Sequence, residues 1–175
     1  MKSKGFLKGI AIVAIVIGSL VMLFQIIGLI IPNLLFSMNF YKDLSEDIFK
    51  VMQDAMKYNI PFNIAGLIVN IGYLISGIML LKVNITGKKI LIFSSIIGIL
   101  VIIGATILHF IVVEPALEKI YRKMFMMKGI GRLVSAIGAI IGLMCSLVFP
   151  LFFLIGIHSS SVKKQFAETQ EGTIN

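Results

Sequence analysis

The stretch FNIAGLIVNIGYLISGIMLLKVNITGKKILIFSSIIGILVIIGATILHFIVV, residues 62–113, decides the fold. It holds two apolar runs, residues 62–81 and 90–113, joined by a short polar link at residues 82–89. Neither run contains Asp, Glu, Lys or Arg, and each has about the 20 residues that a helix needs to cross a bilayer. Because a backbone in lipid must satisfy its own hydrogen bonds, each run is predicted to be a helix. The stretch therefore predicts a membrane hairpin.

Two further apolar runs lie outside this hairpin, at about residues 9–31 and 133–157. The first is longer than the core of a signal peptide and has no small-residue cleavage site, so we expect it to be retained. A mean hydropathy of +1.04 fits a chain that lies mostly in lipid. The sequence predicts an all-α integral membrane protein, a bundle of four transmembrane helices in one domain over residues 1–158. Residues 159–175 are expected to be a flexible tail, because they offer few apolar side chains to bury.

The loops after the first and third spans are each predicted to contain a short amphipathic helix. In the first, at residues 41–58, apolar side chains such as Leu44, Ile48 and Val51 recur at helical spacing, and Pro61 is expected to end the helix. The second covers residues 116–128, after a break or kink at Glu114-Pro115. A helix that lies on the bilayer or caps the bundle is favoured over a partner-binding lid. The acidic loop residues, Glu114 included, are expected to be solvated.

The charge pattern predicts a place in the cell membrane rather than a nucleic-acid partner. The net charge is +8, but the lysines gather at the ends of the apolar runs, where membrane topology and anionic headgroups explain them. Lysine and arginine taken together are equally numerous in the segments on the two sides, with eight on each. The three lysines that precede the first span favour cytoplasmic termini, because the first span usually dominates orientation. Richness in Ile, Lys, Met and Asn, with no Trp, is typical of an AT-rich bacterial genome.

No catalytic, cofactor or metal site is visible in the sequence. The only cysteine, Cys145, lies inside an apolar run, so no intrachain disulfide or Cys-based metal pair is possible. The predicted spans contain no charged residue, which argues against ion-coupled transport, since that chemistry usually needs a buried ionisable group. We expect no catalytic residues, no metal ligands and no cofactor.

Four polar side chains inside the spans form the candidate site: Gln25, Asn70, Tyr73 and His109. With cytoplasmic termini, Gln25, Asn70 and His109 fall in the outer half of the bilayer, where they are predicted to share one small pocket. One interpretation is a ligand or proton site in which His109 titrates. The favoured interpretation is hydrogen bonding between helices.

The fourth span carries a second feature, the pair Gly138 and Gly142 in a small-xxx-small pattern. This pattern permits close approach of two helices. Packing within the bundle is favoured over a dimer contact.

These observations favour an interaction or accessory membrane protein, of a regulatory or protective (immunity) type, over an enzyme. Its partners are expected to be the lipid bilayer and either another membrane protein or a second copy of the chain. The alternative is a small transporter or channel that uses the polar patch in the outer half of the bundle.

Overall fold

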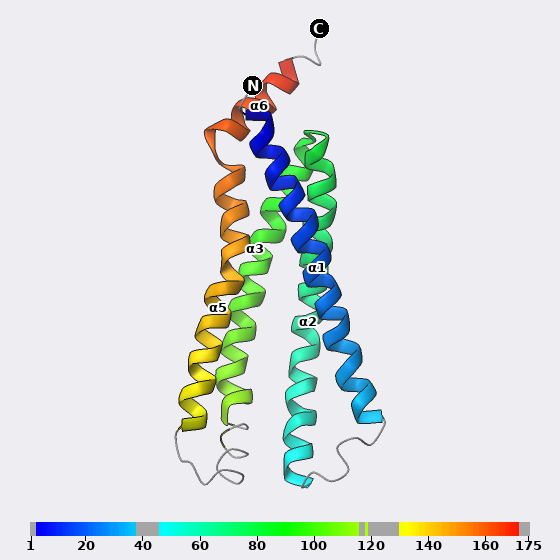
Figure 1. Cartoon of the computed structure of the whole chain (residues 1–175), viewed down its shortest axis with the longest axis vertical. Coiled ribbons are helices and arrows are strands. Elements are labelled where there is room, and N and C mark those ends of the chain that lie inside the picture. The colour runs from blue at the N-terminus through cyan, green and yellow to red at the C-terminus, as the bar shows by residue number, and fades with distance from the viewer. Residues whose placement is uncertain (1–2, 38–45, 116–117, 119–129, 172–175) are drawn as a thin grey trace. The chain divides into compact units, whose positions relative to one another are not determined.

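A computed structural model describes residues 3–37, 46–115, 118 and 130–171 of the chain. The elements in chain order are α1 (Ser3–Ser37), α2 (Glu46–Leu81), α3 (Ile85–Leu108), the π-helical segment η1 (His109–Val113), α5 (Ile130–Ile157) and α6 (Ser160–Glu171) (Figure 1). The described residues contain no strand. Helices long and apolar enough to cross a membrane cover Gly5–Ile31, Lys57–Leu81, Ile85–Val112 and Ala136–Ile157. The predicted all-α protein with four membrane-spanning helices is thus confirmed.

The chain forms two compact units, and each long helix contributes residues to both. Unit 1 consists of Met1–Gln25, Gly66–Ile99 and Val148–Asn175. Unit 2 consists of Ile26–Ala65 and Leu100–Leu147. They are described one at a time.

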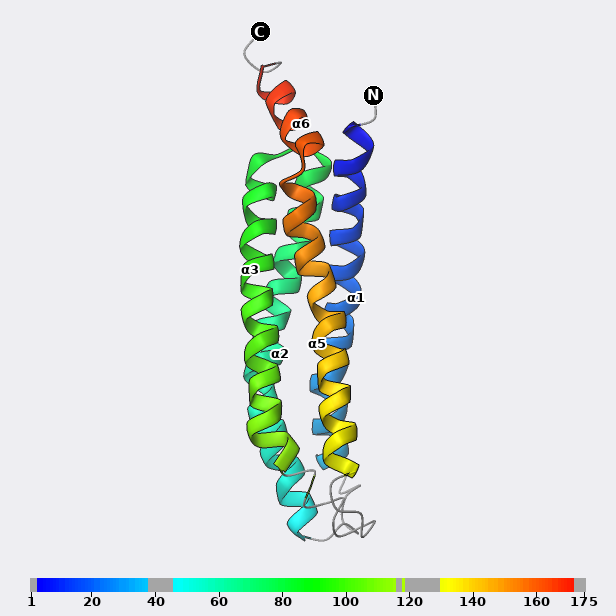
Figure 2. The ribbon, with the colours of Figure 1, turned by 90° about the vertical axis from the view of Figure 1, so that its left-hand side faces the viewer.

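The buried apolar core lies in unit 1. On α1 the buried residues are Leu7, Ile10, Ala11 and Ala14, whose spacing makes one stripe along a helix. The other helices complete the same cluster with Val69, Tyr73, Leu80, Leu91, Phe153, Ile157, Val162 and Phe166. Figures 1 and 2 show the start of α1, the α2–α3 turn and α6 together at one end of this unit. The core therefore draws on every helix that enters unit 1.

Glycine allows α1 and α2 to pack closely in unit 1. A Cβ atom placed on Gly77 would lie 2.7 Å from the backbone oxygen of Ala11 and 2.7 Å from Cγ1 of Ile15. A Cβ atom on Gly18 would lie 2.9 Å from the backbone oxygen of Asn70. Such distances leave no room for any side chain, so the contact between these helices depends on small residues.

The turn between α2 and α3 is shorter than the polar link in the sequence. Asn84 N–H donates to Met79 O at 3.1 Å and Val83 N–H to Leu80 O at 2.9 Å. This is the Schellman pattern that ends many helices, with Val83 in the left-handed position at φ 53°. The Asn84 side chain then accepts a bond from Thr86 N–H at 2.8 Å and caps the start of α3. The lysines at positions 88 and 89 therefore lie on α3 itself.

Residues 160–171 form a helix, which corrects the expectation of a flexible tail from residue 159. The side chains of Val162, Gln165 and Phe166 are buried, with exposed fractions of 0%, 4% and 7%. Their spacing of three and four residues places them on one face of α6. Two apolar side chains one turn apart are enough to dock this short helix, because unit 1 supplies the rest of the core.

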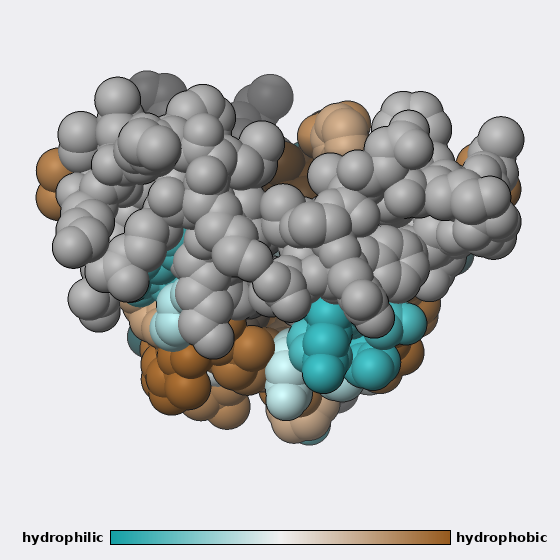
Figure 3. Space-filling view, turned by 90° about the horizontal axis from the view of Figure 1, so that it is seen from below, coloured by the Kyte–Doolittle hydropathy of each residue, from teal (hydrophilic) through white to brown (hydrophobic). Residues whose placement is uncertain are grey.

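Helix α2 runs through Pro61, so the amphipathic segment after the first span is not a separate helix. Pro61 lacks the N–H that would bond the Lys57 carbonyl, and membrane helices tolerate the loss of one such bond. The Pro61 side chain is exposed. The described polar side chains in the first turns of α2 include exposed Lys50 and Gln53. Figure 3, which views the molecule from below, shows hydrophilic and hydrophobic side chains together among the described atoms.

The third span becomes irregular before Glu114-Pro115 rather than at it. Residues 109–113 are π-helical, and Glu114 N–H donates to His109 O, five residues earlier. A proline ring conflicts with the carbonyl four residues before it, which is that of Ile111, and a wider preceding turn relieves this conflict. The helix predicted over residues 116–128 lies outside the described residues, apart from residue 118.

Candidate functional site

Asn70 is the centre of the polar cluster in unit 1. Its Nδ2 atom donates to Gln25 Oε1 at 2.8 Å, which joins α2 to α1. The same atom donates to Gly66 O at 2.9 Å, one turn earlier on α2. Both hydrogens of the Asn70 amide are therefore used by the protein itself. Asn70 is only 5% exposed, and a side chain at Gly66 would collide with the Gln25 amide, so the contact is closely packed.

Tyr73 lies one turn beyond Asn70 on α2 and is 3% exposed. Its ring packs against Phe153 of α5, with 5.0 Å between the ring centroids. Its hydroxyl lies beside Ser95, but the Ser95 hydroxyl donates to Leu91 O at 2.8 Å. Within the described part of the chain, no hydrogen bond of good geometry reaches Tyr73 Oη. Tyr73 therefore contributes mainly aromatic packing, and its hydroxyl has no hydrogen-bond partner among the described residues.

The small hydroxyl residues around this cluster bond within their own helices. Ser76 Oγ donates to Tyr73 O at 2.9 Å, in the same way as Ser95 bonds to Leu91. Ser94 is buried where a side chain on Gly72 would collide with it. The two bonds satisfy the hydroxyls of Ser76 and Ser95 within their own helices, and the contact between Gly72 and Ser94 brings α2 and α3 together.

His109, the fourth predicted site residue, belongs to unit 2, where it is the first residue of η1. Its ring meets the ring of the adjacent Phe110 edge to face, with 5.9 Å between the centroids. The structure thus joins Gln25 and Asn70 directly and places Tyr73 next to them. The pocket predicted to unite His109 with Gln25 and Asn70 stays a prediction.

Glu114 is a buried polar residue that sequence reasoning placed in solvent. It is 6% exposed, which corrects the expectation of a solvated carboxylate. In an α-helix, residues five apart point in directions roughly 140° apart. The π-helical turn, with its bond from Glu114 N–H to His109 O, turns these two residues toward the same side of the helix. The sequence signal for this arrangement was the proline at position 115.

Gly138 and Gly142 face open space. No described atom lies within 4 Å of a Cβ placed on either glycine. The residues that follow on the same side of α5, Cys145 and Ser146, are exposed as well. This corrects the interpretation that the glycine pair packs within the bundle. The helix pairs of unit 1 use other glycines, at positions 18, 77 and 87, for their close contacts.

Among the described residues, no group of three or more His, Cys, Asp or Glu side chains could hold a metal ion. The hydrogen bonds of the polar cluster are amide and hydroxyl bonds, of the kind that holds membrane helices together.

The fold defines the class: a small, helical, multi-pass membrane protein. Comparison with known proteins finds no family model, no curated protein and no solved structure that matches this chain.

Proposed function

We propose that the protein is an interaction or accessory membrane protein, of a regulatory or protective type. We propose that it binds a transmembrane helix of its partner through the face of α5 that contains Gly138, Gly142 and Cys145. The observation that carries this proposal is a contrast among the glycines. Neighbouring helices lie against Gly18 and Gly77, whereas no described atom lies within 4 Å of a Cβ placed on Gly138 or Gly142.

An open glycine face supports helix docking because lipid tails pack poorly into a narrow groove between bulky side chains. Another helix fills such a groove well, and its backbone approaches closely. The exposed Ile141, at 56%, lies beside the glycines on α5 and offers apolar contact area to a docked helix. The partner is either another membrane protein or a second copy of this chain.

The Asn70 amide at the centre of the polar cluster supports the same function, because it has no spare donor. Asn70 gives both of its amide hydrogens to protein oxygens, those of Gln25 and Gly66. A substrate at this position would have to displace a bond between α1 and α2. The cluster is therefore better suited to holding helices together than to passing a solute.

A matched pair of glycine variants tests the proposal. The tagged protein is isolated from its native membranes in mild detergent, and co-purifying proteins and the oligomeric state are measured. Gly142→Leu fills the proposed groove and is expected to release the partner or dissociate the oligomer. Gly28→Leu is the control, because a Cβ placed on Gly28 of α1 also has no atom of the described residues within 4 Å. Retention of the complex by Gly142→Leu contradicts the proposal.

Cys145 distinguishes the two kinds of partner. It follows Gly138 by seven residues and Gly142 by three, so it lies on the same face of α5, and its thiol is exposed. If two copies pair through this face, mild oxidation in membranes is expected to give a disulfide-linked dimer. A different partner leaves the chain monomeric under the same conditions.

The alternative function is a small transporter or channel, and the leftover hydroxyl of Tyr73 is the observation that favours it. Solute flux in liposomes, compared between the wild type and Tyr73→Phe, tests this alternative. Flux that is present and depends on the hydroxyl would replace the accessory function.

We also propose that the protein lies in the cell membrane with both termini in the cytoplasm. The three lysines at the start of the chain and those of the α2–α3 turn support this orientation. Reporter fusions at Ile85 and Asp47 test it, and a cytoplasmic signal from Asp47 reverses it.

A further inference from the structure

One end of unit 1 is rich in lysine. The described lysine side chains at this end come from the start of α1, the α2–α3 turn with the first turns of α3, and α6: Lys8, Lys82, Lys88, Lys89, Lys163 and Lys164. One carboxylate, that of Glu168, is described among them. The segments that carry these lysines lie together at the upper end of Figure 1 and again in Figure 2.

The position of α6 along the membrane normal is fixed within narrow limits. The last span ends at Ile157, and α6 begins at Ser160. The two residues between them can extend at most about 7 Å. The headgroup layer on each side of the hydrocarbon is roughly 5–8 Å thick. Because Val162 and Phe166 anchor α6 in the core of unit 1, Lys163 and Lys164 are held at the level of the headgroups.

The turn between α2 and α3 brings further lysines to the same level. The second span ends at Leu81 and the third begins at Ile85, so Lys82 lies at the boundary of the hydrocarbon. Lys88 and Lys89 lie on the first turns of α3, from which long lysine side chains reach back to the interface. Lys88 is half-buried, and its Nζ atom lies 5.4 Å from the centroid of the Phe166 ring, so it connects the turn to α6.

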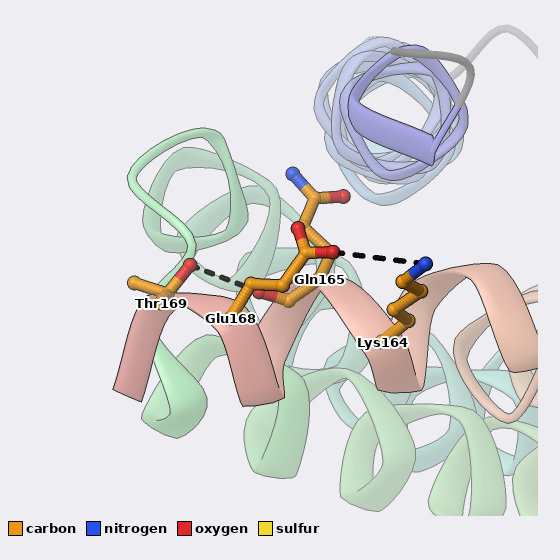
Figure 4. Close-up of polar contacts among 4 residues, drawn as sticks. All are labelled: Lys164, Gln165, Glu168 and Thr169. Carbon is orange, nitrogen blue, oxygen red and sulfur yellow. Dashed lines mark hydrogen bonds and ion pairs between the residues drawn. The ribbon is translucent and has the colours of Figure 1, made fainter. Parts of the chain in front are cut away.

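The single described carboxylate does little to neutralise this end. Lys164 Nζ lies 4.0 Å from Glu168 Oε1, and both side chains are more than half exposed, at 75% and 51%. Exposed pairs of this kind are weak. Figure 4 shows the pair along one turn of α6, with the side chain of Gln165 next to it. Lys163 and Lys164 therefore remain available to an external anion.

We propose that this lysine-rich end of unit 1 binds the headgroup of an anionic phospholipid, with lysines from α6 and from the α2–α3 turn contacting the lipid phosphate. The lysines come from segments distant in sequence, are held together by the core, and lie at the depth where lipid phosphates are found. When the phosphate belongs to a lipid, the acyl chains of that lipid lie along the apolar surface of the spans. A free phosphate gains no such contact. This site uses none of the residues of the α5 face and does not depend on the proposed function.

The test measures lipid preference in nanodiscs that contain phosphatidylglycerol and phosphatidylcholine. The bound lipids are counted by native mass spectrometry of the full chain. The wild type is expected to retain phosphatidylglycerol selectively. Each lysine near an anionic surface contributes about fivefold to binding, so Lys163→Gln with Lys164→Gln is expected to lower this selectivity by up to about 25-fold. Both lysines are exposed, so the fold is kept, and circular dichroism of the variant verifies this.

The control is Lys50→Gln with Lys57→Gln, two exposed lysines of unit 2 that carry the same charge change. This variant is expected to keep the selectivity of the wild type. Unchanged selectivity in the α6 variant overturns the proposal, and so does an equal loss in the control, which would indicate a general charge effect. Displacement of phosphatidylglycerol by inorganic phosphate, but not by chloride at equal ionic strength, also overturns it in favour of a free anion.

Discussion

The bond between Asn70 and Gln25 gives the sharpest test of how the membrane helices are held together. Asn70→Leu removes the donor for Gln25 Oε1, and Gln25→Leu removes the acceptor for Asn70 Nδ2; the two atoms lie 2.8 Å apart. Each single change leaves an amide group without its partner, which costs about 1–3 kcal/mol in a protein interior. Gln25 is only half-buried, and hydrogen bonds between membrane helices average about 0.6 kcal/mol, with a maximum of about 1.7. We therefore expect each single variant to lose about 1–2 kcal/mol.

The double variant is expected to be about as stable as either single variant, because replacing both partners by apolar groups leaves no amide unsatisfied. The coupling energy should then be about as large as the loss of one single variant, about 1–2 kcal/mol. It is measured by a double-mutant cycle of unfolding free energies in a mild detergent. Asn70→Leu combined with Thr106→Val is the control cycle, because Thr106 bonds within its own helix, to Ile102 O at 2.8 Å. Additive losses in the first cycle would refute the role of this bond.

Two further pairs of variants follow from packing. Gly77→Ala is expected to destabilise the protein by about 1–3 kcal/mol, because the new Cβ would lie 2.7 Å from Ala11 O. Gly142→Ala is expected to be neutral or slightly stabilising, because Gly142 lies at an open helix position. Unfolding in detergent measures both, and equal effects would contradict the packing described for α1 and α2. Phe166→Ala is expected to lower the free energy of unfolding by about 3–5 kcal/mol, because Phe166 is 7% exposed in the core. Glu168→Ala removes only an exposed ion pair and should lower it by less than about 1 kcal/mol. If Phe166→Ala is as stable as Glu168→Ala, α6 is not docked.

The membrane spans could be predicted from the sequence because the bilayer imposes its demand on every residue of a span. A run such as residues 62–81 has no other way to satisfy its backbone in lipid than to form a helix. The observed spans accordingly end within about one residue of the predicted ends. Their starts differ more: the first three spans begin earlier than predicted, at Gly5, Lys57 and Ile85, and the fourth begins later, at Ala136.

Helix ends and breaks were predicted less well, because they depend on local competition between backbone preferences. Pro61 was expected to end a helix, yet α2 continues through it. Pro115 acts differently, since the irregular turn lies before it, at residues 109–113. The same residue type thus has two outcomes, and the sequence pattern around each proline does not distinguish them.

The candidate site was predicted in part. Gln25 and Asn70 were chosen because polar side chains in lipid seek partners, and the structure joins them by a hydrogen bond. The buried state of Glu114 was missed because its position next to a polar loop suggested solvent. The open position of Gly138 and Gly142 was missed because a small-xxx-small pattern shows that a helix can pack closely but not against which neighbour.

The sequence by itself determined that the chain crosses the membrane as four helices, since apolar run length against bilayer thickness is a local property of the chain. Only the tertiary structure decided which glycines contact a neighbouring helix and which do not. Gly77 and Gly142 look alike in sequence and differ in whether a described helix lies beside them. The tertiary structure also decided that residues 160–171 fold, because Val162 and Phe166 are too few to stabilise a helix alone and gain their burial from α1, α2, α3 and α5.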